Sequence, residues 1–318
     1  MRAVWLRDFG APDTLRIEDT PDPVAEPGQV LVAVDFAGIT WIETMFRATG
    51  FGPFPKPPMI PGNGVAGTVV AAGSSAERHL VGRRVVTGTG GAGGYAERVA
   101  VDARHVIEVP DGVATDDAAA LLADGRTALM IMEAAGIRTG ERVLVEAAAG
   151  GVGSLLVQLA HAAGAEVVAA AGSAVKREAT LELGADIAVD YREPDWPQTV
   201  RSSGGGIDVV LDGVGGAVAE SAFTLLGTGG RMISFGFSAA AGWPEITDEV
   251  AAERGIRVQR GVFGPPEEQT RRTTEALALT AAGRLRPLIG RRFPLDQAAA
   301  AHTAMENRAV VGKTLLAL

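Results

Sequence analysis

One segment, residues 142–161, constrains the fold of this chain more than any other part of the sequence. It begins with an apolar run, continues through a turn of alanine and glycine, and ends in apolar residues at helical spacing. A strand, a glycine turn and a helix in this order let the backbone approach a pyrophosphate, which then faces the positive end of the helix. The first glycine of the usual G-x-G-x-x-G pattern is replaced by Ala148. The segment predicts a dinucleotide site formed by Ala148, Gly150, Gly151, Val152 and Gly153.

The end of the next predicted strand, residues 166–171, distinguishes between the two nicotinamide dinucleotides. An NAD site usually has an acidic residue about 20 residues after the glycines, which binds the ribose 2′-hydroxyl. No acidic residue lies in residues 167–175, whereas Ser173, Lys176 and Arg177 follow the strand. Hydroxyl and cationic groups suit a 2′-phosphate, so we predict NADPH rather than NADH as the cofactor. The alternative is that Lys176 and Arg177 only solvate the start of a helix.

The composition limits the partners and the chemistry of the chain. Its 318 residues are enough for about two domains. A formal net charge of −9 argues against nucleic acid or an anionic membrane as the main partner, so we expect a small-molecule substrate. The absence of cysteine excludes disulfides, thiolate catalysis and cysteine zinc sites. Because neither a signal pattern nor a membrane-length apolar stretch is found, we expect a cytoplasmic protein.

The order of predicted elements divides the chain into three parts. Residues 1–120 contain short strands interrupted by proline and glycine, and predict a mostly β substrate domain. Residues 121–264 alternate strands and helices, which is typical of a doubly wound parallel Rossmann sheet. Two separate helices are predicted near this junction, at residues 117–122 and 127–135. Residues 265–318 return to strands and are expected to rejoin the first domain, which gives an α/β fold class with a smaller β domain.

Motifs spread over nearly the whole chain resemble those of a known family. They include PGNGVAG at 61–67, GYAE at 94–97, DGRTA at 124–128, AAAGGVG at 147–153 and VGK at 311–313. Together they make the chain similar to zinc-independent medium-chain dehydrogenases/reductases, and most similar to the branch of NADPH quinone oxidoreductases and enoyl reductases. The resemblance implies a GroES-like substrate domain, a central Rossmann domain, and an active cleft between them. It also implies a homodimer joined through the last Rossmann strand, near residues 257–262.

The same resemblance implies which residues contact each part of the cofactor. The polar ones are Thr127 at the nicotinamide, Lys313 at its phosphates, Ser173 and Lys176 at the 2′-phosphate, and Tyr191 and Arg308 along the adenosine. Those expected along the nicotinamide path are Val214, Phe235, Gly236 and Val262. Apolar residues such as these also form ordinary sheet cores, which is the competing interpretation.

The chain departs from the family pattern at several positions. The glycine, histidine and glutamate of zinc-dependent relatives correspond to the segment Gly62-Asn63-Gly64, and the four histidines show no metal-type spacing, so no metal is expected. Quinone reductases usually have an asparagine where this chain has Thr40, and tyrosines where it has Met45 and Phe51. These changes predict a more apolar substrate pocket. Its candidate walls are Trp41, Phe46, Phe51 and Phe54, which are equally typical of core packing.

Hydride transfer to an electron-poor carbon is the chemistry that needs neither a metal nor a cysteine. We expect a quinone or an α,β-unsaturated carbonyl as the acceptor, with Thr40 or Asn63 donating a hydrogen bond to the oxygen on which charge develops. A pathway-specific enone or enoyl reductase is one alternative, and an NADPH-binding protein without turnover is another. An alcohol dehydrogenase is disfavoured because no group is found that would polarise the alkoxide. No proton donor is assigned.

Overall fold

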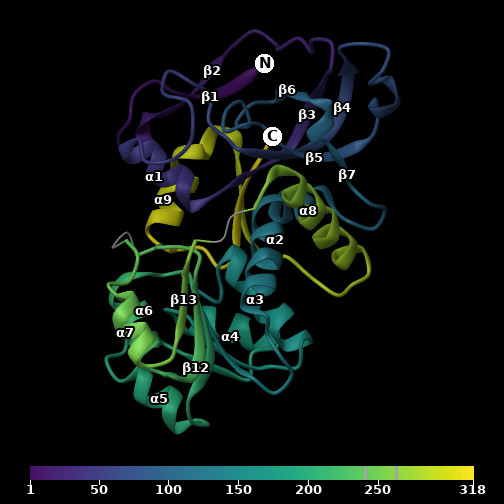
Figure 1. The fold of residues 1–318 in the computed structure, drawn as a ribbon. Coiled ribbons are helices and arrows are strands. Elements are labelled where there is room, and N and C mark those ends of the chain that lie inside the picture. Colours follow the sequence, from purple (N-terminus) through teal and green to yellow (C-terminus); the bar gives the residue numbers. More distant parts are fainter. Residues whose placement is uncertain (240–241, 262–263) are drawn as a thin grey trace. The chain divides into compact units, whose positions relative to one another are not determined.

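The structure is a computed structural model that describes residues 1–239, 242–261 and 264–318 (Figure 1). It divides into two compact units: unit 1 contains Met1–Gly125 and Thr270–Leu318, and unit 2 contains Arg126–Gln269. The divisions fall within two helices, α2 (Thr115–Ala135) and α8 (Pro266–Ala281). The two helices predicted at residues 117–122 and 127–135 are wrong, because α2 is continuous. A single glycine costs a helix only about 1 kcal/mol, and Gly125 is needed because a Cβ there would lie 2.8 Å from the Cβ of Ala276.

Unit 2 is built on a six-stranded sheet with the order β10-β9-β8-β11-β12-β13, in which every neighbouring pair is parallel. The strands are β8 (Arg142–Glu146), β9 (Glu166–Ala170), β10 (Ile187–Val189), β11 (Ile207–Asp212), β12 (Leu226–Ser234) and β13 (Arg257–Arg260). The helices are α3 (Gly151–Ala162), α4 (Ala174–Glu182), α5 (Trp196–Ser202), α6 (Gly216–Phe223) and α7 (Asp248–Glu253). Helices α3 and α4 lie on one side of β12 and β13 in Figure 1, and α6 and α7 lie on the other.

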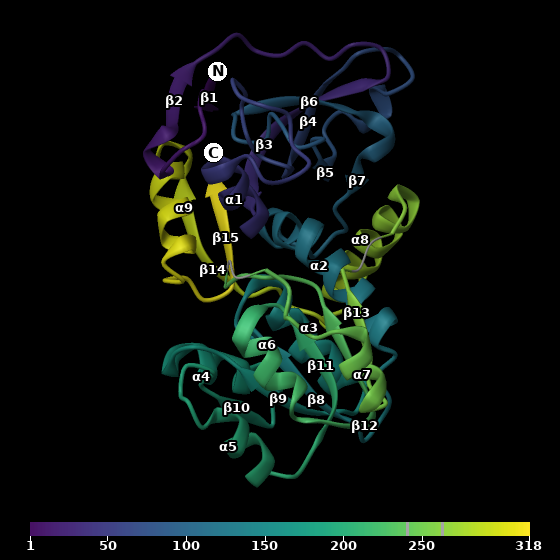
Figure 2. The same cartoon turned by 60° about the vertical axis from the view of Figure 1, so that its left-hand side comes forward.

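The order of the strands locates the ligand-binding edge of this sheet. Figure 2 shows β9, β8 and β11 as neighbours in the middle of this sheet, in the lower part of the view. From β8 the chain first builds outward through β9 and β10, and then returns to add β11 on the opposite side. Open α/β sheets bind ligands at the carboxyl ends of the strands beside such a reversal. The predicted Rossmann fold is confirmed, and the loops after β8 and β11 lie at its expected binding edge.

Unit 1 contains a seven-stranded sheet and a separate two-stranded sheet of β1 (Arg2–Leu6) and β2 (Leu15–Asp19). The larger sheet has β3 (Gln29–Ile39), β4 (Gly64–Ala72), β5 (Arg84–Gly88), β6 (Arg98–Asp102), β7 (Ile107–Glu108), β14 (Ile289–Pro294) and β15 (Lys313–Ala317). Its helices include α1 (Trp41–Thr49) and α9 (Ala298–Glu306). The carboxyl-terminal strand β15 pairs antiparallel with β3, so residues from both ends of the chain build one sheet.

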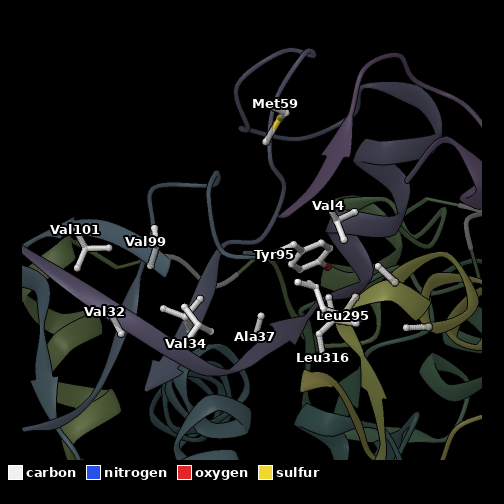
Figure 3. Close-up of a cluster of buried hydrophobic side chains, with 14 of the residues drawn as sticks. Val4, Val32, Val34, Ala37, Met59, Tyr95, Val99, Val101, Leu295 and Leu316 are labelled. Carbon is white, nitrogen blue, oxygen red and sulfur yellow. The ribbon is translucent and has the colours of Figure 1, made fainter. Parts of the chain in front are cut away.

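The core of unit 1 contains a buried polar pair. Tyr95 is fully buried, and Figure 3 shows its ring beside Val4, Leu295 and Leu316. The Tyr95 hydroxyl lies 3.1 Å from Nε2 of His302. Burial lowers the pKa of His302 to about 3, so the ring is neutral at physiological pH. Tyr95 is therefore part of the packing of unit 1.

Candidate functional site

The glycine loop after β8 depends on one close approach between backbones. Gly150 precedes α3 in an extended conformation, and Ala147 has a φ of 47°. A Cβ on Gly153 would lie only 2.2 Å from the carbonyl oxygen of Ala147. Any other residue at position 153 would push the helix away from the turn, so the glycine is required by packing.

The first turn of α3 can bind an anion through its backbone. The first N–H groups of a helix have no intrahelical partner, and in α3 they belong to Gly151, Val152 and Gly153. The Ser154 hydroxyl donates to the carbonyl of Gly151 at 3.0 Å and leaves these N–H groups available. Ala148 is held from the strand side, since its N–H donates to the carbonyl of Ala170 at 3.2 Å. The loop therefore presents backbone donors and the positive end of a helix dipole, which suit a pyrophosphate.

Ser173 and Lys176 lie together at the carboxyl end of β9. Ser173 is the N-cap of α4, and its hydroxyl accepts a hydrogen bond from the N–H of Lys176 at 3.3 Å. This hydrogen bond fixes the Ser173 side chain at the start of α4, and Lys176 lies in the first turn of the same helix. This is the position at which a ribose 2′-substituent is expected.

A carboxylate also lies at this end of the sheet, but two arginines neutralise it. Asp190 follows β10 and accepts hydrogen bonds from Nη1 of Arg177 at 2.6 Å and from Nη2 of Arg192 at 2.7 Å. The hydrogen bonds from Arg192, with help from Arg177, hold the pKa of Asp190 well below its ordinary value. Sequence inspection found Arg177 but missed Asp190 and Arg192, because they come from the following strand.

Tyr191 also contacts the end of β9. A Cβ on Gly172 would lie 3.3 Å from the Tyr191 hydroxyl and 3.3 Å from Cδ of Arg192. The glycine thus leaves room for both side chains against the backbone just before Ser173. The structure brings together the residues predicted for the 2′-phosphate and one of the two predicted for the adenosine.

The loops after β11 and β12 pack on each other. The ring of Phe235 crosses Gly213, where an added Cβ would lie 2.7 Å from the ring carbon Cζ. Val214 is buried, and its carbonyl accepts the N–H of Ala239 at 3.0 Å. Gly236 approaches Gly213 from the same side. Three of the four residues predicted along the nicotinamide path are therefore grouped in unit 2, while the fourth, Val262, lies outside the described residues.

The remaining residues predicted to contact the cofactor lie apart from these loops in the chain. Thr127 is half-buried in the part of α2 that belongs to unit 2. Arg308 and Lys313 belong to unit 1. Arg308 is exposed after α9 with a φ of 54°. Lys313 is buried at the start of β15, and its Nζ lies 2.9 Å from Oδ1 of Asp124.

In unit 1 a buried glutamate joins the two residues predicted to donate to the substrate. Glu43 accepts the Thr40 hydroxyl at 2.6 Å and the Thr40 N–H at 2.7 Å on Oε2, and the Asn63 N–H at 2.9 Å on Oε1. Burial raises the pKa of Glu43, while these hydrogen bonds and the charge of Lys313 oppose the rise. The Thr40 hydroxyl therefore donates to Glu43, whereas the half-buried Asn63 side chain makes no hydrogen bond within the described residues.

The helical i,i+4 spacing of Glu43 and Arg47 predicts a surface ion pair, with a place at the border of the cleft as the alternative. The surface ion pair is wrong. Both side chains are buried. Arg47 instead donates to the carbonyl of Gly10 and forms an ion pair with Glu306 of α9. The sequence signal that identifies the role of Glu43 is a capping box, because a threonine at the N-cap is followed three residues later by glutamate.

The aromatic residues predicted as pocket walls occupy different environments. Phe46 is 4% exposed in the core of unit 1, and its ring packs edge to face with Phe54 at 5.1 Å. Phe51 is 53% exposed. Trp41 is the first residue of α1, and its buried Nε1 has no hydrogen-bond partner among the described residues. Phe46 and Phe54 thus pack in the core of unit 1, Trp41 is half-buried like Phe54, and Phe51 is the one exposed candidate of the four.

Neither a cluster of metal ligands nor a membrane-spanning helix is found among the described residues. Within residues 1–239, 242–261 and 264–318, no three histidine or carboxylate side chains gather where they could hold a metal ion. No helix in this described part is long and apolar enough to span a bilayer.

Comparison with known proteins identifies the family. Residues 26–111 match a family model described as an alcohol dehydrogenase GroES-like domain, and residues 183–316 match one described as a zinc-binding dehydrogenase. The chain is 31% identical over 326 residues to a quinone oxidoreductase of Homo sapiens, a match that covers 100% of this chain and 98% of the relative.

Solved structures show the same relationship. The structure of Escherichia coli quinone oxidoreductase complexed with NADPH has 28% identity and a TM-score of 0.90, with 100% of both chains covered. A structure described as an NAD-dependent alcohol dehydrogenase has 30% identity and a TM-score of 0.90, again with 100% of both chains covered. The chain belongs to the quinone oxidoreductase branch of the zinc-independent medium-chain dehydrogenases/reductases.

Proposed function

We propose that the chain is an NADPH-dependent, metal-free reductase that transfers hydride to a quinone or an α,β-unsaturated carbonyl. The observation that carries the proposal is the charge at the ends of β9 and β10. Arg177 and Arg192 both bind the carboxylate of Asp190 there, and Lys176 lies in the first turn of α4, next to Arg177 in the chain. An excess of positive charge beside the Ser173 hydroxyl suits a 2′-phosphate and disfavours a ribose 2′-hydroxyl that requires a free acid.

The relatives support the same cofactor. The E. coli quinone oxidoreductase structure contains NADPH. The neighbour described as NAD-dependent makes NADH the alternative cofactor for this fold, so the test must compare the two. In the proposed complex the N–H groups of Gly151, Val152 and Gly153 bind the pyrophosphate, and Val214, Phe235 and Gly236 lie along the nicotinamide.

We assign the contact with the hydride acceptor to Thr40, Glu43 and Asn63 of unit 1, which are joined by hydrogen bonds. Bound NADPH supplies a hydride, and its addition to a conjugated carbonyl leaves negative charge on the carbonyl oxygen. The Asn63 amide is proposed to donate to that oxygen, because its side chain makes no hydrogen bond within the described structure. Thr40 can donate only when Glu43 is protonated, since its hydroxyl otherwise donates to Oε2. An oxyanion donor of this kind is worth about 2.7 to 4 kcal/mol in barrier height.

The decisive experiment reverses one charge at the proposed 2′-phosphate site. Lys176→Glu is expected to raise KM for NADPH by about tenfold or more, which corresponds to the loss of one charge-assisted contact, and to change KM for NADH little. Lys56→Glu, the same change at an exposed lysine of unit 1, is the matched control and should leave both constants unchanged. Equal effects of Lys176→Glu on both cofactors would remove the 2′-phosphate assignment.

A second measurement separates turnover from binding alone. NADPH fluorescence and NADPH consumption are followed together in the presence of a naphthoquinone or an enone. A reductase consumes NADPH with at least one of these acceptors, and their relative rates distinguish a general quinone reductase from a pathway enone reductase. A shift in fluorescence without consumption by either acceptor would instead establish a nucleotide-binding protein.

The proposed assembly is a homodimer through β13. This strand is the last in the described sheet of unit 2, and one of its sides has no strand partner in the described residues. An edge strand of this kind can pair with the same strand of a second copy. Light scattering on the purified protein is expected to give twice the mass of 32.7 kDa, and a monomeric mass would reject this assembly.

A further inference from the structure

Three polar residues end neighbouring strands in the middle of the unit 2 sheet. Glu146 is the last residue of β8, Asp212 of β11 and Ser234 of β12. Asp212 pairs in register with Ser234, and the residues before Glu146 and Asp212 pair with each other. All three are 0% exposed. They therefore form a buried row, named here the carboxyl row, directly beneath the loops assigned to the cofactor.

The hydrogen bonds of the carboxyl row are incomplete unless a proton is present. Oδ1 of Asp212 accepts the N–H of Val214 at 3.0 Å and the N–H of Gly215 at 2.8 Å, which fixes the loop that follows β11. Oδ2 of Asp212, both carboxyl oxygens of Glu146 and the Ser234 hydroxyl have no partner in the described structure. If both carboxyls were ionised, Oδ2 of Asp212 and both oxygens of Glu146 would be buried without a donor, whereas one proton between the two carboxyls supplies a hydrogen bond.

The surroundings assign that proton to Glu146. Burial raises the pKa of Glu146 well above its ordinary value, and the adjacent Asp212 adds to the rise. Only the nearby N–H of Val214, which makes its hydrogen bond to Asp212, opposes it. On either side of the two carboxyls, Glu146 pairs with Ala170 of β9 and Asp212 pairs with Ser234 of β12, and both of these neighbours are uncharged. The loops after β8 and β11, residues 147–150 and 213–215, carry no charged side chain. Asp212 is the better anion of the pair because two backbone N–H groups already donate to it.

We propose that Glu146 keeps a proton in the folded protein and donates it to Oδ2 of Asp212, so that Glu146 is a positioning residue for the loop at residues 213–215. Val214 of that loop is assigned to the nicotinamide path, so the part of this inference that concerns NADPH rests on the proposed function. When Glu146 ionises, the two carboxylates repel each other and Asp212 no longer holds the Val214 and Gly215 N–H groups in place. Loss of one proton therefore loosens the cofactor loop without any change at the cofactor's phosphates.

The direction of the pH dependence follows from the raised pKa. A carboxyl whose pKa is higher in the folded than in the unfolded chain stabilises the fold fully below its unfolded pKa. That contribution is lost as the pH rises through the folded pKa. Both the stability of unit 2 and the affinity for NADPH should therefore fall on the alkaline side.

The test compares wild type, Glu146→Gln and Glu182→Gln between about pH 6 and about pH 9. Glu182 is an exposed glutamate of α4 and serves as the matched control. Wild type and Glu182→Gln should lose urea resistance with rising pH, and their NADPH dissociation constants should rise by up to about tenfold per pH unit. Glu146→Gln, whose amide donates permanently, should be flat in both measurements. A flat wild type, or an unchanged slope in Glu146→Gln, would overturn the proposal.

A spectroscopic measurement keeps the test independent of the variant's stability. The infrared spectrum of glutamate-labelled wild type at neutral pH should contain the carbonyl band of a protonated carboxyl, and this band should be missing from Glu146→Gln. A wild-type spectrum with ionised carboxylates alone overturns the proposal even if Glu146→Gln fails to fold. Failure of NADPH to bind at any pH would reject the proposed function, while the urea and infrared measurements would still decide the protonation of Glu146.

Discussion

Two buried glutamates, one in each unit, differ in the groups that surround the carboxyl. Glu43 in unit 1 is 5% exposed and Glu146 in unit 2 is 0% exposed, and burial is the first cause of a raised pKa in both. Glu43 accepts three hydrogen bonds and is attracted by the charge of Lys313. Glu146 faces another carboxyl and has no hydrogen-bond donor among the described residues. Burial alone does not determine a charge state, because the donors around the carboxyl decide it.

The largest expected effect comes from replacing Lys313, the buried cation that is paired with Asp124 in unit 1. Lys313→Met should lower the free energy of unfolding by about 3 to 5 kcal/mol, because Asp124 is left buried without its ion-pair partner. Urea unfolding measures the loss. The double variant Lys313→Met/Asp124→Asn should recover most of it, and failure to recover would mean that Lys313 acts through packing rather than charge.

The next largest loss of stability is expected from replacing Glu43, the buried glutamate of unit 1. Glu43→Ala should cost about 2 to 4 kcal/mol, because the N–H groups of Thr40 and Asn63 lose their acceptor. Glu146→Gln in unit 2, which keeps the shape of the side chain, should cost less than about 1 kcal/mol near neutral pH, since neither Glu146 oxygen accepts a hydrogen bond in the described structure. Similar costs for the two variants would contradict the distinction drawn between the units.

The pH dependence of stability should separate the two carboxyls. Each has a raised folded pKa, so each contribution is lost as the pH rises, by about 1.4 kcal/mol for every unit by which the folded pKa exceeds the unfolded one. The donors around Glu43 limit its rise, so its contribution should be lost at lower pH than that of Glu146. The free energy of unfolding of the wild type, measured across the pH range, should fall in two steps. Glu43→Gln should lack the step at lower pH, and Glu146→Gln the step at higher pH. A single step, removed by either variant, would show that the two groups do not titrate separately.

The smallest effects concern the hydroxyls. Ser234→Ala should change stability by less than about 0.5 kcal/mol, because the Ser234 hydroxyl has no partner to lose. Thr40→Val should cost about 1 kcal/mol, since it removes the hydrogen bond to Glu43. Calorimetric melting temperatures rank the two. If Ser234→Ala proved the more harmful, Ser234 would belong to the hydrogen-bonded part of the carboxyl row.

The sequence predicted unit 2 better than unit 1, because the pattern of unit 2 is local. A strand, a glycine turn and a helix follow one another within residues 142–161, and the structure has β8 and α3 there. For helix α1 only the helical spacing of Glu43 and Arg47 was noticed, and the capping box that marks its start was missed. The strand β2 and the short helices α5 and α7 were also missed, since they carry too few residues to show a period.

Candidate site residues were predictable where one segment supplies them. Ser173 and Lys176 follow a single strand, and their position could be inferred from the spacing after the glycines. The neutralisation of Asp190 by Arg177 and Arg192, and the meeting of Glu146 with Asp212, depend on which strands are neighbours. Spacing along the chain does not contain that information.

The contact between Gly153 and the carbonyl of Ala147 has a consequence for how this molecule tolerates change. The distance between turn and helix is set by main-chain atoms alone, so no rotamer has to be frozen when a phosphate arrives, and little conformational entropy is lost there. The side chains around the turn are free to drift over evolutionary time provided that position 153 keeps a hydrogen in place of a methyl group.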